Sequence, residues 1–111
     1  MKNPLWSLEE AIGLIEVYLN NAMNPNVKKD ELQQFRQILL NRIRKLDIKH
    51  EENFRNIKGL NIQLRCIDKI FNNNYEGFGQ GGKIFIDAYK IYKDEYNRYK
   101  EILETLYCKY K

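Results

Sequence analysis

The sequence predicts an all-α protein: a single compact domain of about five helices. Apolar residues recur at the three- and four-residue spacing of amphipathic helices along most of the chain, and no segment alternates as a half-buried strand does. A chain of 111 residues is long enough to bury a core without disulfides or metal ions. The expected helices cover residues 7–23, 30–45, 56–72, 83–93 and 94–109 of one domain that spans residues 1–111.

The first expected helix has clear start and stop signals. Ser7-Leu8-Glu9-Glu10 is a capping box, in which the serine hydroxyl accepts from the Glu10 amide and the Glu10 carboxylate accepts from the serine amide. Pro25 lacks a backbone donor and disfavours helical backbone in the residue before it, so the helix should end near residue 23. Trp6 is expected to pack back on the first turn.

A polar link that contains His50, the single histidine, joins the second and third expected helices. The second ends in a basic turn, which suits the negative end of the helix dipole: Arg42, Arg44 and Lys45. The third has apolar residues at positions 57, 60, 64, 67 and 71, and we expect it to fill the centre of the domain. Gly59, near its start, implies that another backbone approaches it closely.

Residues 72–82 are rich in asparagine and glycine, which tolerate turns with positive φ. Gly77 to Gly82 fits the G-x-G-x-x-G spacing of phosphate loops, but Ile84 stands where a P-loop has Ser or Thr. No buried strand leads into this loop, so we expect no bound nucleotide. Beyond it, Asp94 is a favourable helix cap and is predicted to separate the last two helices.

Positive charge is concentrated in the middle third of the chain. Residues 36–69 carry nine Lys or Arg against four Asp or Glu, whereas residues 1–35 carry three against five and residues 70–111 seven against six. Such clustering is the electrostatic pattern of a nucleic-acid binder, although the charged faces of ordinary helices produce similar excesses. The middle third is therefore where a binding surface is expected.

The cysteines and the hydropathy pattern indicate a cytoplasmic protein. Cys66 and Cys108 lack Cys-x-x-Cys spacing, and a pair of reduced thiols is expected. No apolar run approaches the ~18 residues of a membrane span, and residues 1–10 contain no signal-peptide core. We expect no membrane partner.

The sequence predicts no enzyme and no cofactor. A hydrolase needs a nucleophile with a base, and a metal centre needs several ligands, whereas His50 has no companions of these kinds nearby in the sequence. The acidic pairs, such as Glu51-Glu52, are adjacent in sequence and therefore diverge on a helix. No catalytic or metal-binding residue is expected.

The order of features resembles the N-terminal helical domain of McrA-like HNH endonucleases that cut modified DNA. The shared frame runs from about Trp6 to Leu103: Trp6-Ser7-x-Glu9-Glu10, Tyr18, a helix with a basic last turn, Phe54-Arg55-Asn56-x-x-Gly59-x-x-x-x-Leu64, a glycine-rich loop, and two closing helices around Tyr89 and Tyr92. The aromatic-Arg-Asn triplet with its glycine is the most specific part of this frame.

The sequence departs from that family at three positions. Ile57 stands where members usually have proline, Gln63 where they have lysine, and the Tyr89 region where they have a tryptophan. No nuclease domain accompanies the frame within these 111 residues. The resemblance therefore implies a module that reads DNA or assembles with a partner in a restriction, defence or mobile-element system, without cleavage.

Two functional hypotheses follow. The first is a module that binds double-stranded DNA, in which cations contact phosphates and amide side chains approach base edges. Its expected contact residues are Arg42, Arg44, Lys45, Arg55, Asn56, Lys58, Asn61, Arg65 and Lys69, with Gln63 as a further amide. For Arg55, at a helix entrance, a structural bridge to a carboxylate or to carbonyls is as well supported as a phosphate contact.

The alternative is a protein-interaction module, such as a phage or mobile-element inhibitor of a host nuclease of the anti-restriction or anti-CRISPR type. Tyrosine is favoured at protein interfaces, and the chain has eight tyrosines. The expected anchors are Tyr75, Phe78, Tyr96, Tyr99, Tyr107 and Tyr110.

Overall fold

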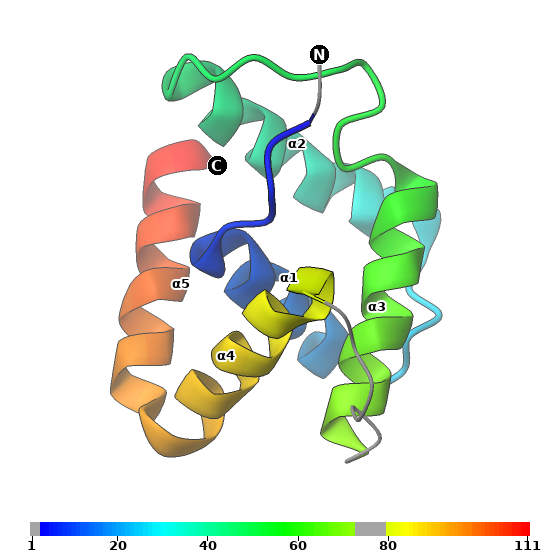
Figure 1. Cartoon of the computed structure of the whole chain (residues 1–111), viewed down its shortest axis with the longest axis vertical. Coiled ribbons are helices and arrows are strands. Elements are labelled where there is room, and N and C mark those ends of the chain that lie inside the picture. Colours follow the sequence, from blue (N-terminus) through cyan, green and yellow to red (C-terminus); the bar gives the residue numbers. More distant parts are fainter. Residues whose placement is uncertain (1–2, 73–79) are drawn as a thin grey trace.

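The computed structural model describes residues 3–72 and 80–111, with the side chains of residues 80 and 81 excepted. Its five helices are α1 (Leu8–Asn20), α2 (Lys29–Lys45), α3 (Ile57–Phe71), α4 (Gln80–Asp94) and α5 (Tyr96–Tyr110) (Figure 1). The described ranges contain no strand, and the Cα radius of gyration of 13.3 Å is that of one compact domain. The all-α fold is confirmed. None of these helices combines the length and the apolar character needed to cross a bilayer.

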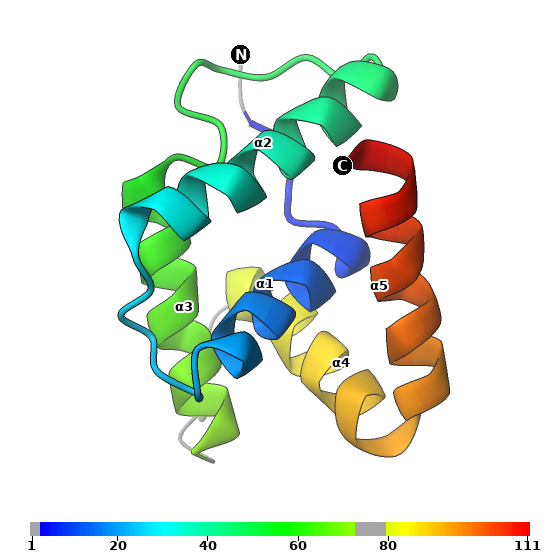
Figure 2. The same cartoon turned by 180° about the vertical axis from the view of Figure 1, so that it is seen from behind.

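Helix α1 occupies the centre of the bundle. Figures 1 and 2 show α3 on one side and α5 on the other, with α1 and α4 between them and α2 crossing one end. Helix α1 contacts α3, α4 and α5, and its segment from Ala11 to Ile15 is buried on every side. The expectation that the third helix fills the centre is wrong, because only one stripe of α3 is buried, at Leu60, Leu64, Ile67 and Ile70.

Three helix ends differ from the expected positions by two or more residues. Helix α4 begins at Gln80, three residues before its expected start and inside the expected loop of residues 72–82. The other two differences have local causes. Helix α1 ends at Asn20, because Ala22 and Met23 take positive φ values of 58° and 59° and the Met23 amide donates to the Tyr18 carbonyl. The last two helices separate at Glu95, which is the N-cap of α5 but makes no side-chain capping bond. Asp94, the expected cap, is the last residue of α4.

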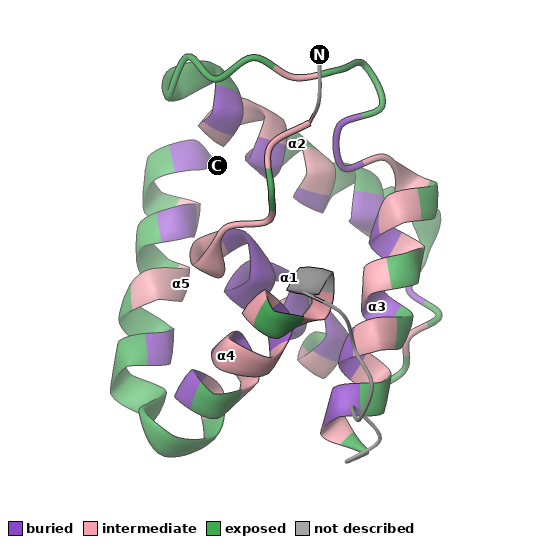
Figure 3. Cartoon of the chain, in the orientation of Figure 1, coloured by how far each residue is buried: buried purple, intermediate pink, exposed green. Residues whose placement is uncertain are grey.

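The predicted capping box of α1 is present, and α3 also has a side-chain cap, which was not predicted from the sequence. The Ser7 hydroxyl accepts from the Glu10 amide at 3.2 Å, and the Glu10 carboxylate accepts from the Ser7 amide at 3.0 Å, so the capping box is complete. Asn56 caps α3 by accepting from the Gly59 amide at 2.9 Å. Burial follows the inward faces of the helices, while the outer faces of α3 and α5 are largely exposed (Figure 3).

The close approach expected at Gly59 occurs instead at Gly13. A Cβ at Gly59 would meet only the Asn56 Oδ1 atom, at 3.1 Å, and no other element of the described chain within 4 Å. A Cβ at Gly13 would lie 2.7 Å from Leu106 Cδ2 and 2.8 Å from Phe35 Cε1. Glycine at position 13 therefore lets α1, α2 and α5 pack together at one point.

Candidate nucleic-acid interface

Arg55 lies inside the protein. It is 9% exposed, and its guanidinium donates from Nε and Nη2 to the two carboxylate oxygens of Glu10, both at 3.0 Å. A further bond of 3.1 Å runs from Nη2 to the Pro4 carbonyl. Arg55 thus has the carboxylate and carbonyl partners that a structural bridge at this position requires.

Two aromatic rings complete the surroundings of Arg55. Its Cζ atom lies 4.4 Å from the ring centroids of both Trp6 and Phe54, so the guanidinium is held by cation–π contacts as well as by charge. A phosphate would have to displace Glu10 and deprive that buried carboxylate of its bidentate partner, which is costly. Arg55 is therefore removed from the expected DNA-contact set.

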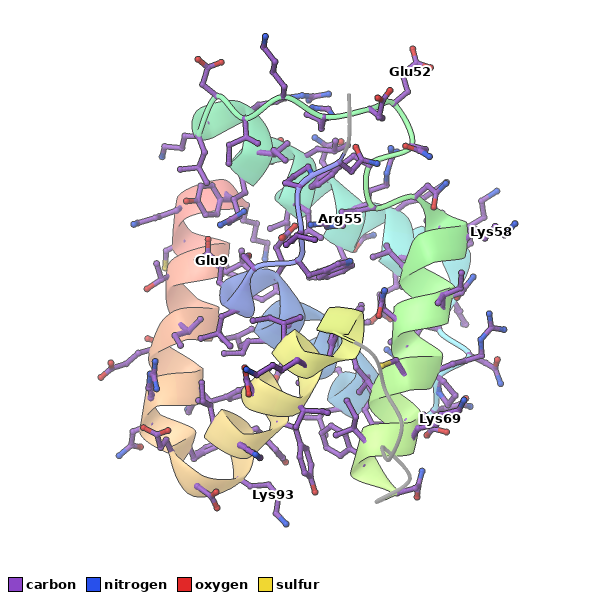
Figure 4. The ribbon with its side chains drawn as sticks, viewed as in Figure 1. Glu9, Glu52, Arg55, Lys58, Lys69 and Lys93 are labelled. Carbon is purple, nitrogen blue, oxygen red and sulfur yellow. The ribbon has the colours of Figure 1, made fainter. Side chains whose placement is uncertain are left out.

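Two more expected contact residues serve the fold. Arg42 forms an ion pair with Glu9, lies 4.0 Å from a Glu10 oxygen, and has a side chain that is only 14% exposed. Glu9, Glu10, Arg42 and Arg55 together form what we call the inner charge cluster. In Figure 4 Glu9 and Arg55 lie toward the middle of the molecule, whereas Lys58 and Lys69 point away from it. Asn56 is occupied as the cap of α3.

Three exposed cations remain on α3: Lys58, Arg65 and Lys69. Their spacings of seven and four residues place them within about 40° of one another around the helix and along about 16 Å of its axis. None has a carboxylate within ion-pair distance in the part of the chain that the structure describes. We call these three residues the α3 stripe.

A cleft of about 330 Å³ lies beside the α3 stripe. Its lining comes from the link between α1 and α2 and from α3: Pro25, Asn26, Val27, Lys28, Asn61 and Arg65. Lys28 thus brings a fourth cation to this side of the molecule. Sequence reasoning missed Lys28 and Asn26 because they belong to the acidic first third, and nothing local shows that this link folds against α3.

The remaining expected DNA contacts lie elsewhere. Arg44 and Lys45 are exposed and lie in the last turn of α2. Both ribbon views show that this end of α2 is far from α3 (Figures 1 and 2). Lys45 Nζ lies 5.8 Å from the ring centroid of Tyr110. Gln63 lines a different cleft, with Trp6 and Lys83. The basic middle third is therefore divided among an interior cluster, the far end of α2 and the α3 stripe.

The tyrosines named as protein anchors do not share one exposed surface. Tyr99 and Tyr110 are buried, and the Tyr99 hydroxyl donates to Glu16 at 2.8 Å. Burial, reinforced by that hydrogen bond, raises the pKa of Tyr99 well above its ordinary value. Tyr107 is half-buried and Tyr96 is 52% exposed. Tyr75 and Phe78 lie outside the described residues.

The described residues contain no group of three or more His, Cys, Asp or Glu that could hold a metal ion. His50 packs on the Phe54 ring at 5.2 Å, and its Nδ1 lies 2.9 Å from the Glu51 carbonyl. Cys66 is half-buried and Cys108 exposed, and both are free thiols.

No protein-family model, no curated protein and no solved structure matches this chain. The resemblance to McrA-like N-terminal domains thus depends on the quoted residues alone. One of these residues, Arg55, has a structural role in this fold.

Proposed function

We propose that the chain is a small DNA-binding module that contacts the phosphate backbone of a duplex through the α3 stripe. The observation that carries this proposal is the alignment of Lys58, Arg65 and Lys69 on one exposed helix face without carboxylate partners among the described residues. Unpaired cations can exchange bound counterions for phosphates, which is the main source of non-specific affinity for DNA. We also propose that this module acts in the cytoplasm and catalyses no reaction.

The neighbouring cations strengthen this choice of surface. Lys28 joins Arg65 at the cleft beside the stripe, and Lys29 follows at the start of α2. The inner charge cluster supports the surface indirectly, since it fixes the Phe54-Arg55 turn that leads into α3. A restriction, defence or mobile-element setting is proposed from the sequence resemblance alone.

Binding of the full chain to a mixed-sequence duplex over a salt series tests the proposal. The logarithm of affinity should fall linearly with the logarithm of salt concentration, with a slope of about 0.9 per phosphate contacted and therefore near three. Absence of binding at low salt, or an affinity that salt does not change, would contradict it.

A protein-interaction module is the second candidate. A cleft of about 390 Å³ between α1, α2 and α5 favours it, because Val17, Phe35 and Ile38 line this cleft together with Tyr107 and polar side chains. Capture of the same single protein from a native lysate before and after nuclease treatment would support this candidate, whereas capture that nuclease abolishes would support DNA binding.

A further inference from the structure

We propose that the cleft between the α1–α2 link and α3 holds one phosphate group of the nucleic-acid backbone, with Arg65 as its principal ligand and Asn61 as a hydrogen-bond donor. This inference rests on the proposed function, and it adds a defined phosphate site to what would otherwise be a diffuse contact along the α3 stripe. Such a phosphate site would fix the register of the module on the backbone.

The chemistry of the lining selects an anion. Among the residues that the structure describes, every polar side chain that lines the cleft is a cation or an amide, and none is a carboxylate: these side chains are Lys28, Arg65, Asn26 and Asn61. Two cations would repel a metal ion, whereas an arginine fork and amide NH₂ groups are donors that match phosphate oxygens. With a volume of about 330 Å³, the cleft is at the small end of ligand sites.

These donors are available. Neither the Asn26 nor the Asn61 side-chain amide has a hydrogen-bond partner in residues 3–72 and 82–111, and Arg65 has no ion-pair partner there. Two of the nearby carboxylates accept hydrogen bonds from other residues. Asp68 accepts from the Tyr18 hydroxyl at 2.7 Å, and Glu31 accepts from the Asn21 amide at 2.7 Å.

The link is already shaped for binding. Asn24 Oδ1 accepts from the backbone N–H of Asn26 at 2.9 Å, which closes a local turn, and Val27 is buried with 8% exposure. A preformed site loses little conformational entropy when a ligand binds. Asp30 and Glu31 in the first turn of α2 weaken the positive potential of that helix end, so affinity should depend mainly on Arg65.

Two substitutions distinguish a defined phosphate site from a diffuse electrostatic contact. Asn61→Ala removes no charge, so it should weaken duplex binding by about three- to tenfold and leave the salt slope unchanged. Arg65→Lys keeps the charge but loses the fork, and it should weaken binding by a similar factor, again without changing the slope. Asn97→Ala, at an exposed asparagine of α5, is the matched control and should bind as the unmodified chain does. Circular dichroism checks that each variant is folded.

A second readout does not depend on duplex binding. Inorganic phosphate titrated against chloride at equal ionic strength should shift the Arg65 Nε–H and Asn61 side-chain amide resonances, and these shifts should be absent with chloride. If the chain binds no duplex but phosphate shifts both resonances, the phosphate site is supported and the proposed function fails. If duplex binding depends on Lys58 and Lys69 but is unaffected by Asn61→Ala and Arg65→Lys, the DNA proposal is supported and the phosphate site is overturned. If phosphate gives no specific shift and the chain binds no duplex, both are overturned.

Discussion

The guanidinium of Arg55 and the carboxylate of Glu10, which are 45 residues apart in sequence, form a bidentate ion pair inside the protein. The same carboxylate accepts from the Ser7 amide in the capping box of α1. One acidic side chain thus joins the start of α1 to the turn that precedes α3, and the stability of the fold should depend on it.

Arg55→Ala is expected to lower the free energy of unfolding by about 3–5 kcal/mol, because it removes the bidentate partner of the buried Glu10 carboxylate and leaves only the more distant Arg42, 4.0 Å from one of its oxygens. Denaturant titration measures this change. The control is Arg98→Ala, which removes an ion pair with Glu95 whose side chains are 54% and 53% exposed and should change stability by less than about 1 kcal/mol. An Arg55→Ala variant no less stable than the Arg98→Ala variant would show that the inner charge cluster does not stabilise the fold.

Gly13→Ala is expected to destabilise the protein although alanine favours helix. The added methyl group would lie within 3 Å of Leu106 and Phe35, both buried, and overpacking costs typically 1–3 kcal/mol against the ~1 kcal/mol that alanine gains in a helix. Thermal melting of Gly13→Ala beside Gly59→Ala measures the difference. Gly59→Ala meets only the cap oxygen and should change stability by less than about 1 kcal/mol. An equal effect at both positions would refute the close packing at Gly13.

Asn56→Ala should lower stability by about 1 kcal/mol through loss of the α3 cap, and it should leave duplex affinity unchanged at temperatures where the protein is folded. Asn56→Asp keeps an acceptor for the Gly59 amide and should retain most of the stability. A loss of affinity with unchanged stability would instead restore the base contact expected from the sequence.

Cys66 should react more slowly than Cys108 with iodoacetamide near pH 8. Burial raises the pKa of the Cys66 thiol, with Lys69 opposing the shift, so less of the reactive thiolate is present at that pH. Cys108 is exposed on α5. Mass spectrometry of peptides from the folded protein measures both rates, and unfolding in denaturant should bring them together. Faster alkylation of Cys66 in the folded state would contradict its placement.

Local signals in the sequence were sufficient for the fold class but not for the site. The capping box at Ser7 and the apolar spacing of α3 are read within one or two helical turns, and the structure contains both. The role of Arg55 depends on Glu10, and the cleft depends on Lys28 and Arg65 lining the same space. Such pairings join segments distant in sequence, so neither charge counts nor periodicity can reveal them.

The proposal that the α3 stripe contacts DNA is tested most directly by comparing two triple variants of equal charge. One is Lys58→Gln/Arg65→Gln/Lys69→Gln. The other is Arg44→Gln/Lys100→Gln/Lys109→Gln, which removes one Arg and two Lys from exposed positions on α2 and α5. Salt-dependent duplex binding is measured for both. The α3 variant should lose most of its affinity and about two to three units of the salt slope, while the control keeps a slope close to that of the unmodified chain. Equal losses in the two variants would show that affinity follows net charge alone and would contradict an interface on α3.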